Sequence, residues 1–333
     1  MTVTTIDSAA RPSLVGHRKV ADTGFRWVAL GCGLLVLVIL ALIAIFTTNQ
    51  AWPAFTHTSA RFFTSTTWNP GHTTVANGQQ VADPQLGIWK FVYGTLISSL
   101  IALVLAVPVS LGIALFLTEL APPRLRTPVV YLIDILASVP SVVYGLWGVL
   151  FLVVPLSHFY KNVSDAFHSV PVLDSLLKGQ EGKSFFTAGI IVALMVVPII
   201  TSLTREVFAT VPRAQKEAAL ALGSTRWEMM RTSILGYGRS GVVGAVMLGL
   251  GRAMGETIAV ALVIGSFPRI TLNLFKGGDA MASVIANQFG EAQGLQRAAL
   301  IGLGVVLFVI TIVVNMVARG FVSRSERAAG AAR

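Results

Sequence analysis

Long apolar runs separated by shorter polar or charged stretches dominate the chain. A helix rises ~1.5 Å per residue, so crossing the ~30 Å hydrocarbon core of a bilayer takes about 20 apolar residues. Six runs reach that length, and the pattern therefore predicts an all-helical membrane protein with six transmembrane helices. The predicted spans cover residues 27–46, 91–117, 127–156, 184–204, 240–267 and 298–318.

The polar segments divide the chain into five predicted parts. Residues 1–26 form a flexible tail, residues 27–48 contain the first span, and residues 49–88 form a polar segment outside the membrane that is rich in Thr, Ser, Asn and Gly. Residues 89–320 hold the other five spans, and residues 321–333 form a second tail. A cleaved signal peptide is the alternative for the first run, but its 20 uncharged residues exceed a typical signal-peptide core.

Positive charge favours one side of the membrane. If the N-terminus is cytoplasmic, sixteen of the 25 Lys and Arg residues lie on the cytoplasmic side and eight lie outside. This excess follows the positive-inside rule and predicts that both termini are cytoplasmic. The formal net charge of +10 then reflects topology and anionic lipid headgroups. It does not indicate nucleic-acid binding, because no basic and aromatic patch gathers in a soluble module.

Composition supports the membrane assignment and argues against chemistry in this chain. The sequence is 54% hydrophobic and 12% charged, with a mean hydropathy of +0.74, which is more apolar than a soluble domain. The lone Cys32 excludes an intrachain disulfide and a cysteine-based metal cluster. All five histidines fall in the tail or in polar connections. We therefore predict no catalytic residue and no metal site.

A charged loop at residues 212–238, PRAQKEAALALGSTRWEMMRTSILGYG, carries strong local signals. Pro212 suits a first helical turn, and Gly223 can end that helix in the left-handed conformation. Thr225 followed by Glu228 is a capping box, which predicts that a second helix begins at once. The loop should therefore form two short helices joined at a bend. Helices this short are marginal in water, so we expect this elbow to dock against a partner.

The sequence KEAALALG, followed by the hydrophobic pair at 234–235, resembles the EAA loop of ATP-binding-cassette (ABC) importer permeases. The resemblance implies a type I ABC importer permease fold, in which this cytoplasmic loop contacts the ATPase subunit. The family usually has Pro where this chain has Gly236, and a hydrophobic residue where it has Ser233. The residues that the resemblance assigns to ATPase coupling are Glu217, Ala218, Ala219, Gly223 and Trp227.

Two further stretches resemble the phosphate-importing members of that family. They are SVPSVVYGLWG at 138–148 and GLGRAMGETIAV at 249–260. The resemblance implies one half of the pathway of an ATP-driven phosphate importer in the bacterial inner membrane, working by alternating access. It also implies a second permease subunit, an ATPase dimer and a phosphate-binding protein as partners. Sulfate or molybdate is an alternative solute, and a stand-alone secondary anion transporter is an alternative class that would not need the elbow.

Two motifs in the chain look like nucleotide sites but lack required residues. Gly182-Lys183-Ser184 resembles the end of a phosphate-binding loop, yet Leu177 stands where the first glycine is needed. The glycines of 249–255 miss the dinucleotide spacing by one position, and no strand precedes them. We therefore predict that this chain binds no cofactor. ATP and Mg²⁺ would be used by the partner ATPase.

The fifth predicted span carries two charges. Arg252 lies about 20 Å along a helix from Arg239 at the cytoplasmic edge, where a charge costs about 2.5–3.5 kcal/mol. Glu256 is four residues on, so one continuous helix would place both side chains on the same face. Our hypothesis is that Arg252 faces the substrate pathway and offers its planar guanidinium to phosphate oxygens. The alternative is an interhelical ion pair that only locks the subunit to its partner.

Other candidates are weaker. Thr257 joins the predicted pathway set because it follows Glu256 directly, and Asp134 faces either the pathway or a structural position at the interface. Asp279 precedes a short apolar segment at 281–289, which predicts either a capped helix on the outer face or a solvated loop. The predicted hinge and helix-packing positions are Pro140, Gly145, Gly251 and Gly255.

Overall fold

The computed structural model describes residues 19–76, 79–167, 169–179 and 181–330. The chain divides into two compact units, Met1–Asn49 and Gln50–Arg333. Helix α1 (Lys19–Thr58) begins in the first unit and ends in the second. It therefore includes the last residues of the predicted N-terminal tail, and it continues ten residues beyond the predicted end of the first span region at residue 48. Residues 1–18 of that tail lie outside the described residues.

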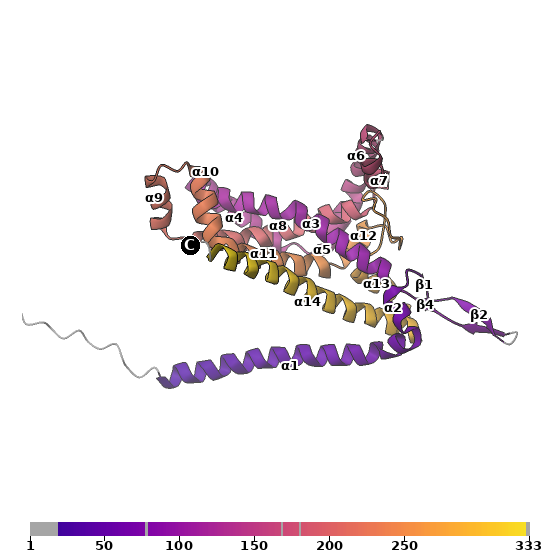
Figure 1. The fold of residues 1–333 in the computed structure, drawn as a ribbon. Helices are drawn as coiled ribbons and strands as arrows, with labels where there is room; N and C mark the ends of the chain where they lie inside the picture. Colours follow the sequence, from indigo (N-terminus) through magenta and orange to yellow (C-terminus); the bar gives the residue numbers. More distant parts are fainter. Residues whose placement is uncertain (1–18, 77–78, 168, 180, 331–333) are drawn as a thin grey trace, which may run out of the picture. The chain divides into compact units, whose positions relative to one another are not determined.

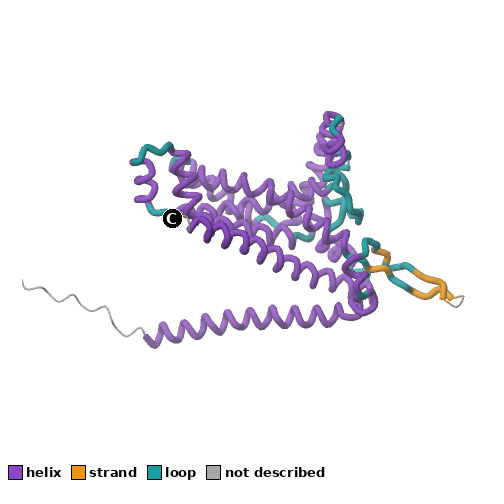
Figure 2. Tube along the Cα trace, viewed as in Figure 1, coloured by secondary structure: helices purple, strands orange, loops and turns teal. Residues whose placement is uncertain are grey.

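The polar segment at 49–88 combines the end of α1 with a second helix and four short strands. Helix α2 (Ala60–Thr64) is followed by two antiparallel pairs of strands. Strand β1 (Trp68–Asn69) pairs with β4 (Gln85–Leu86), and β2 (Thr73–Ala76) pairs with β3 (Gln79–Ala82). These are the strands coloured orange in Figure 2. No fold could be predicted for this segment, because its short polar runs lack a clear period.

Helices make up most of the second unit, as predicted, and the elbow helices α9 and α10 lie at the opposite end from α6 and α7 (Figure 1). In chain order the remaining elements are α3 (Trp89–Leu115), the π-helix η1 (Phe116–Leu120), α4 (Pro123–Ser138), α5 (Ser141–Trp147), the π-helix η2 (Gly148–Leu152), α6 (Val153–Phe167), α7 (Pro171–Leu177), α8 (Phe185–Ala209), α9 (Arg213–Ala221), α10 (Arg226–Met229), the π-helix η3 (Met230–Ile234), α11 (Leu235–Gly255), α12 (Ile258–Val263), α13 (Met281–Gln288) and α14 (Gly294–Gly330).

Helix α8 is the centre of the second unit. It packs against both α3 and α11 and is the most buried of the candidate spans. Small residues permit the close approach: a Cβ added to Gly189 would lie 2.4 Å from a side-chain carbon of Ile101 on α3. On α11, a Cβ at Gly249 would lie 2.8 Å from Ile200 of α8. Glycine at these two positions therefore lets the helix backbones come together.

Six helices are long and apolar enough to cross a membrane, which confirms the predicted number of spans. The prediction of one continuous third span at 127–156 is wrong. Helix α4 ends at Ser138, Val139 and Pro140 are extended, and the span runs instead over Ser141–Phe167. Proline causes the break because it has no N–H to donate and because it disfavours helical dihedrals in the residue before it.

Two further expectations are settled by the fold. The predicted helix near 281–289 forms as α13, and Met281 to Val284 are buried, so the solvated-loop alternative is wrong. Helix α14 continues to Gly330, so the predicted tail at 321–333 is helical as far as that residue. The end of the last span is therefore not the end of its helix.

Candidate functional site

The elbow forms by the predicted local signals. Helix α9 begins after Pro212, and Gly223 has the left-handed φ of +86° that glycine adopts without strain. The Thr225 hydroxyl accepts a bond from the Glu228 N–H, and the Glu228 carboxylate accepts one from the Thr225 N–H. The capping box is therefore confirmed. Its first residue, Thr225, caps the start of α10 and stands three residues after Leu222, the C-cap of α9.

The second elbow helix is not short, contrary to our expectation. Helix α10 passes through η3 directly into α11, giving one 30-residue candidate span over Arg226–Gly255. The reason is Gly236, which stands where the family usually has Pro. Glycine keeps its backbone N–H and therefore does not interrupt the helix. The elbow thus consists of one separate short helix, α9, and a bend. The next candidate span begins directly after the capping-box residue Thr225.

The side chains assigned to ATPase coupling are mostly exposed. Glu217, Ala218 and Trp227 are exposed, Ala219 is half-buried, and the bend residue Leu222 is 88% exposed. An exposed leucine at the bend and an exposed tryptophan in α10 are apolar side chains of the kind found at protein contacts. The arrangement is therefore suited to docking, and it brings the predicted coupling residues together at one end of the second unit (Figure 1).

The fifth predicted span is broken at Glu256, and the expected i, i+4 pair with Arg252 is wrong. Helix α11 ends at Gly255, Glu256 is extended with ψ of 127°, and α12 begins at Ile258. The Glu256 carboxylate accepts a bond of 3.3 Å from the Ala259 N–H, so it turns toward α12. The Thr257 hydroxyl donates to the Gly255 carbonyl at 3.1 Å. These bonds satisfy backbone groups that the break would leave unpaired.

A second break, at Val139 and Pro140, lies between α4 and α5. The Tyr144 hydroxyl donates to the Leu136 carbonyl at 3.0 Å and so ties α5 back to the end of α4. Helix α5 packs against α12, and a Cβ added to Gly145 would lie 2.8 Å from the Ala259 Cα. The two short helices that follow the two breaks are therefore in direct contact.

Arg252 is exposed and lies beside this contact. Its guanidinium is within electrostatic range of the Tyr144 hydroxyl. In the described part of the chain it makes no ion pair and no hydrogen bond with another residue. Asp134 on α4 is also exposed and forms no ion pair with Arg252. The structure thus leaves one guanidinium free in a membrane span.

The other predicted packing positions behave differently from one another. Gly145 makes the close contact just described. No atom of a neighbouring element lies within 4 Å of a Cβ built at Gly251 or Gly255, whereas Gly249 contacts α8 closely. The predicted GxxxG contact of Gly251 and Gly255 would therefore have to involve another chain, and it stays a prediction.

Tyr144 is the residue whose role sequence analysis underestimated. The sequence presents it only within the stretch SVPSVVYGLWG, but its hydroxyl bridges the break between α4 and α5. A tyrosine four residues after a proline inside an apolar run was the available signal. A polar tip there must find a partner in the freed carbonyls of the preceding helix.

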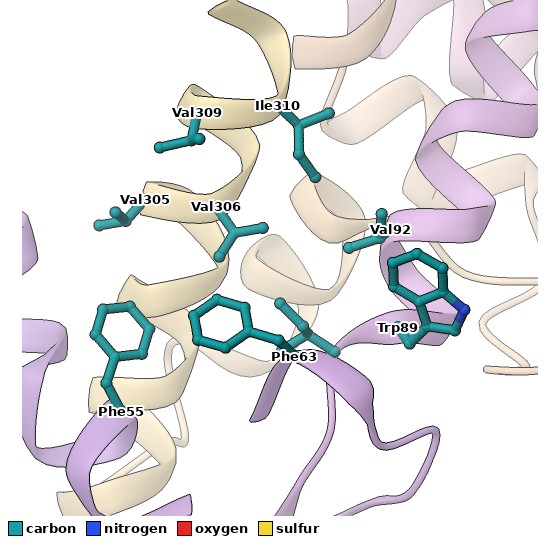
Figure 3. A pocket seen from close by; sticks show the side chains of 9 residues that line it. Phe55, Phe63, Trp89, Val92, Val305, Val306, Val309 and Ile310 are labelled. Atoms are coloured by element: carbon teal, nitrogen blue, oxygen red, sulfur yellow. The ribbon is translucent and has the colours of Figure 1, made fainter. Parts of the chain in front are cut away.

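An apolar groove of about 460 Å³ lies elsewhere in the second unit (Figure 3). Its walls carry no charged side chain, so it offers nothing to an anion. Among the described residues, no group of three or more His, Cys, Asp and Glu side chains is placed to hold a metal ion. The groove is lined by Phe55, Phe63, Ile88, Trp89, Val92, Val305, Val306, Val309 and Ile310.

Comparison with known proteins identifies the family. The model of the binding-protein-dependent transport system inner membrane component matches residues 106–328, more than half of the chain. The chain belongs to this family. As an inner membrane transport component with six candidate spans, it is a multi-pass membrane protein that acts with partner subunits.

The relatives of this transport component are similar over nearly their whole length. The phosphate transport system permease protein PstC of Pasteurella multocida (strain Pm70) is 42% identical over 317 residues, covering 94% of this chain and 95% of that protein. The protein of the same name from Xylella fastidiosa (strain Temecula1) is 43% identical over 313 residues, covering 93% of each. A solved bacterial ABC transporter involved in the import of the acidic polysaccharide alginate has a TM-score of 0.56 at 16% identity, over 92% of this chain and 99% of that chain. That likeness supports the ABC importer permease fold alone.

Proposed function

We propose that this chain is the transmembrane permease subunit of an ATP-driven inorganic phosphate importer and forms half of the translocation pathway. Relatives 42% and 43% identical over more than nine tenths of the chain are phosphate permeases. The observation that carries the proposal is Arg252, an exposed guanidinium in a candidate membrane span that makes no ion pair within the described part of the chain. A free charge at this depth is costly unless a pathway or an anion receives it.

The geometry gives the site residues different roles. Arg252 offers a planar fork of donors, which suits two oxygens of a tetrahedral anion. Glu256 turns toward the Ala259 N–H and so leaves Arg252 unneutralised. Thr257 completes the break, and Asp134 supplies an exposed carboxylate on α4. In this proposal Arg252 contacts phosphate, and the other three shape the pathway around it.

In this proposal each exposed surface of the chain is assigned a partner. A second, related permease subunit covers the face that exposes Arg252 and completes the pathway. An ATPase dimer binds the elbow at Glu217 to Gly223 and uses ATP and Mg²⁺, so this chain binds no nucleotide and performs no catalysis. A phosphate-binding protein delivers the anion from outside. Both termini then lie in the cytoplasm of a bacterium, with the subunit in the inner membrane.

Transport in this arrangement works by alternating access. Closure of the ATPase pair on ATP displaces α9, and the spans open outward to receive phosphate from the binding protein. The breaks at Pro140 and Glu256 give two short helices, α5 and α12, that stay in contact while the longer helices on either side change direction. Arg252, three residues before the end of α11, would become accessible first from one side of the membrane and then from the other.

Uptake in cells tests the function and the solute together. Labelled phosphate is supplied at low concentration to wild-type cells, to cells lacking this chain and to complemented cells, with and without excess sulfate or molybdate. We expect uptake to require the chain and to resist both competitors. Uptake suppressed by sulfate or molybdate would instead assign another tetrahedral oxyanion, and uptake that does not need the chain would refute an import role.

Purification separates an ABC permease from a transporter that works alone. An ATPase subunit should co-purify with the full chain and be lost on Glu217→Lys, because Glu217 is exposed on α9. Glu291→Lys makes the same charge change in an exposed position next to α13, far along the chain, and should keep the ATPase. If no ATPase accompanies the wild-type chain, a stand-alone anion transporter is the better assignment.

A further inference from the structure

Helix α9 is joined to the second span by an ion pair. The Lys216 Nζ donates to the Glu119 Oε1 at 2.5 Å, and the two residues are 97 positions apart in the sequence. Their side chains are only 20% and 14% exposed. The other ion pairs among the described residues, Arg269 with Glu181 and Lys178 with Asp174, are longer and more exposed. This bond is therefore the least solvent-screened of the three.

Few other contacts hold α9. None of its residues is buried, and Ala219 alone packs against the buried cluster at the elbow end of the unit. Apart from Lys216, no α9 side chain in the described structure hydrogen-bonds to another element. The chain itself connects α9 only to α8 and α10. Among the described residues, the side-chain hydrogen bond that joins α9 to the span formed by α3 and η1 is therefore the one between Lys216 and Glu119.

Glu119 occupies a special turn of the second span. The π-helix η1 follows α3 without interruption, and the candidate span runs to Leu120. A π-helical turn holds more residues than an α-helical turn, so it rotates the last side chains relative to the rest of the span. Leu117 in the same turn is buried, which anchors η1 in the core. Glu119 thus joins a firmly packed turn to a loosely held helix.

We propose that the Glu119–Lys216 ion pair is the link by which displacement of α9 reaches the second transmembrane span. Helix α9 and the η1 end of that span then move as one body during transport, with both residues acting as positioning residues. This inference rests on the proposed function, because it assumes that the ATPase moves α9. A short, shielded, charge-assisted bond is strong enough for the task, and removing one partner leaves the other charge unpaired.

The ratio of phosphate transported to ATP hydrolysed measures this link. The complete importer, with its ATPase, second permease and binding protein, is reconstituted into proteoliposomes carrying Glu119→Gln or Lys216→Met. We expect ATP hydrolysis to continue while phosphate transported per ATP falls by about tenfold, the effect of losing a charge-assisted bond. Glu119→Gln is the cleaner variant because Glu119 is not on the elbow. Lys178→Met breaks the exposed ion pair on α7 and should leave the ratio unchanged.

A cross-link tests whether the two residues move together. In a Cys32→Ala background, which removes the single native cysteine, Glu119→Cys and Lys216→Cys are joined by a bifunctional thiol cross-linker that reductant cleaves. Phosphate transported per ATP should be retained while the two thiols are joined and should fall when reductant cleaves the cross-link, because the two free thiols cannot form the ion pair. The inference is overturned if the cross-link arrests transport, or if both single substitutions keep the wild-type ratio. Failure of the wild-type importer to transport phosphate would instead overturn the proposed function, so the two results are distinguishable.

Discussion

Arg252 lies three residues before the end of α11, and its surroundings keep its charge available. The carboxylate that the sequence places one helical turn away belongs to Glu256, which the helix break turns toward the Ala259 N–H. The Tyr144 hydroxyl, which is uncharged, lies within electrostatic range of the Arg252 guanidinium. An arginine braced by an ion pair would have little attraction left for an anion. An unpaired one keeps its five donors for a ligand.

Replacing Arg252 should therefore stop transport without unfolding the protein. We expect Arg252→Gln to lower phosphate uptake at least tenfold, since a bond to a charged donor contributes about 1.5–3 kcal/mol, and Arg252→Lys to restore only part of it because lysine lacks the planar fork. Uptake at matched membrane levels is the measurement. Arg239→Gln, an exposed arginine on the same helix, is the control. Equal uptake by the Arg252→Gln and Arg239→Gln variants would remove Arg252 from the pathway.

Asp279 is a buried carboxyl outside the candidate spans. It is 4% exposed, and it accepts bonds from the Ala280 N–H and the Ser283 hydroxyl. Burial raises the pKa of Asp279 from 3.8 to about 6, against the opposing effect of those two bonds. The folded protein therefore keeps a proton on this group between about pH 4 and 6, whereas the unfolded chain releases it.

The raised pKa of Asp279 determines how the stability of the protein changes with pH. The contribution of the bound proton is complete below pH 3.8 and is lost as the pH rises through about 6. Between pH 5 and pH 7.5 we expect the free energy of unfolding to fall by on the order of 1 kcal/mol through Asp279, since the rest of the effect lies below pH 5. Thermal unfolding of the purified importer at both pH values measures this. Asp279→Asn should flatten the difference, and an unchanged slope in that variant would assign it to other groups.

At the scale of elements, the contact between α5 and α12 joins the two broken helices. Helix α12 is shorter than a membrane span and would not be stable alone, whereas α5 continues through η2 into α6 as one candidate span. Their closest approach is at Gly145, where a Cβ would meet the Ala259 Cα at 2.8 Å and the side chain of Leu262 at 2.9 Å. Because backbone atoms lie on the opposite side, the contact cannot yield by turning a side chain.

One added methyl group should therefore separate these helices. We expect Gly145→Ala to lower the unfolding temperature of the purified importer and to reduce uptake, because overpacking typically costs about 1–3 kcal/mol. Gly112→Ala on α3 adds the same methyl where nothing lies within 4 Å, and it should be neutral or stabilising. A Gly145→Ala variant as stable and active as the Gly112→Ala variant would show that the contact is dispensable.

Local signals explain which elements the sequence predicted correctly. The capping box at Thr225 and Glu228 and the turn at Gly223 act within a few residues, and each is present in the structure. The break at Glu256 could not be predicted in this way. No proline precedes it, and its stability comes from contacts with α5, more than 100 residues earlier in the chain. The periodicity and hydropathy of the sequence identify long helices. They do not show where tertiary contacts interrupt a helix.

The pairing within the candidate site was mispredicted for the same reason. Sequence spacing placed Arg252 and Glu256 on one face, which is true only of an unbroken helix. The role of Tyr144 depends on the break between α4 and α5, across which its hydroxyl reaches the Leu136 carbonyl. The residues of the site were therefore recognised by their types and by family resemblance, whereas their mutual geometry required the structure.

At the scale of the whole molecule, we expect the elbow and the strands β2 and β3 to lie on opposite sides of the membrane. Helix α3 begins directly after the strands and ends at η1, which contacts the elbow helix through Glu119. One crossing of the membrane by α3 would separate the two regions. The positive charge of the elbow predicts that the elbow is cytoplasmic and that the strands are outside.

Cysteine labelling checks this orientation in intact cells. In the Cys32→Ala background, Val75→Cys on β2 and Leu222→Cys on the elbow each introduce one thiol at a position 75% or 88% exposed. With a membrane-impermeant maleimide, we expect the Val75→Cys protein to react in spheroplasts and the Leu222→Cys protein to react only after the membrane is permeabilised. Permeabilised samples of both variants show that each thiol is reactive. Labelling of Leu222→Cys in intact spheroplasts would reverse the topology, and the elbow could not then meet a cytoplasmic ATPase.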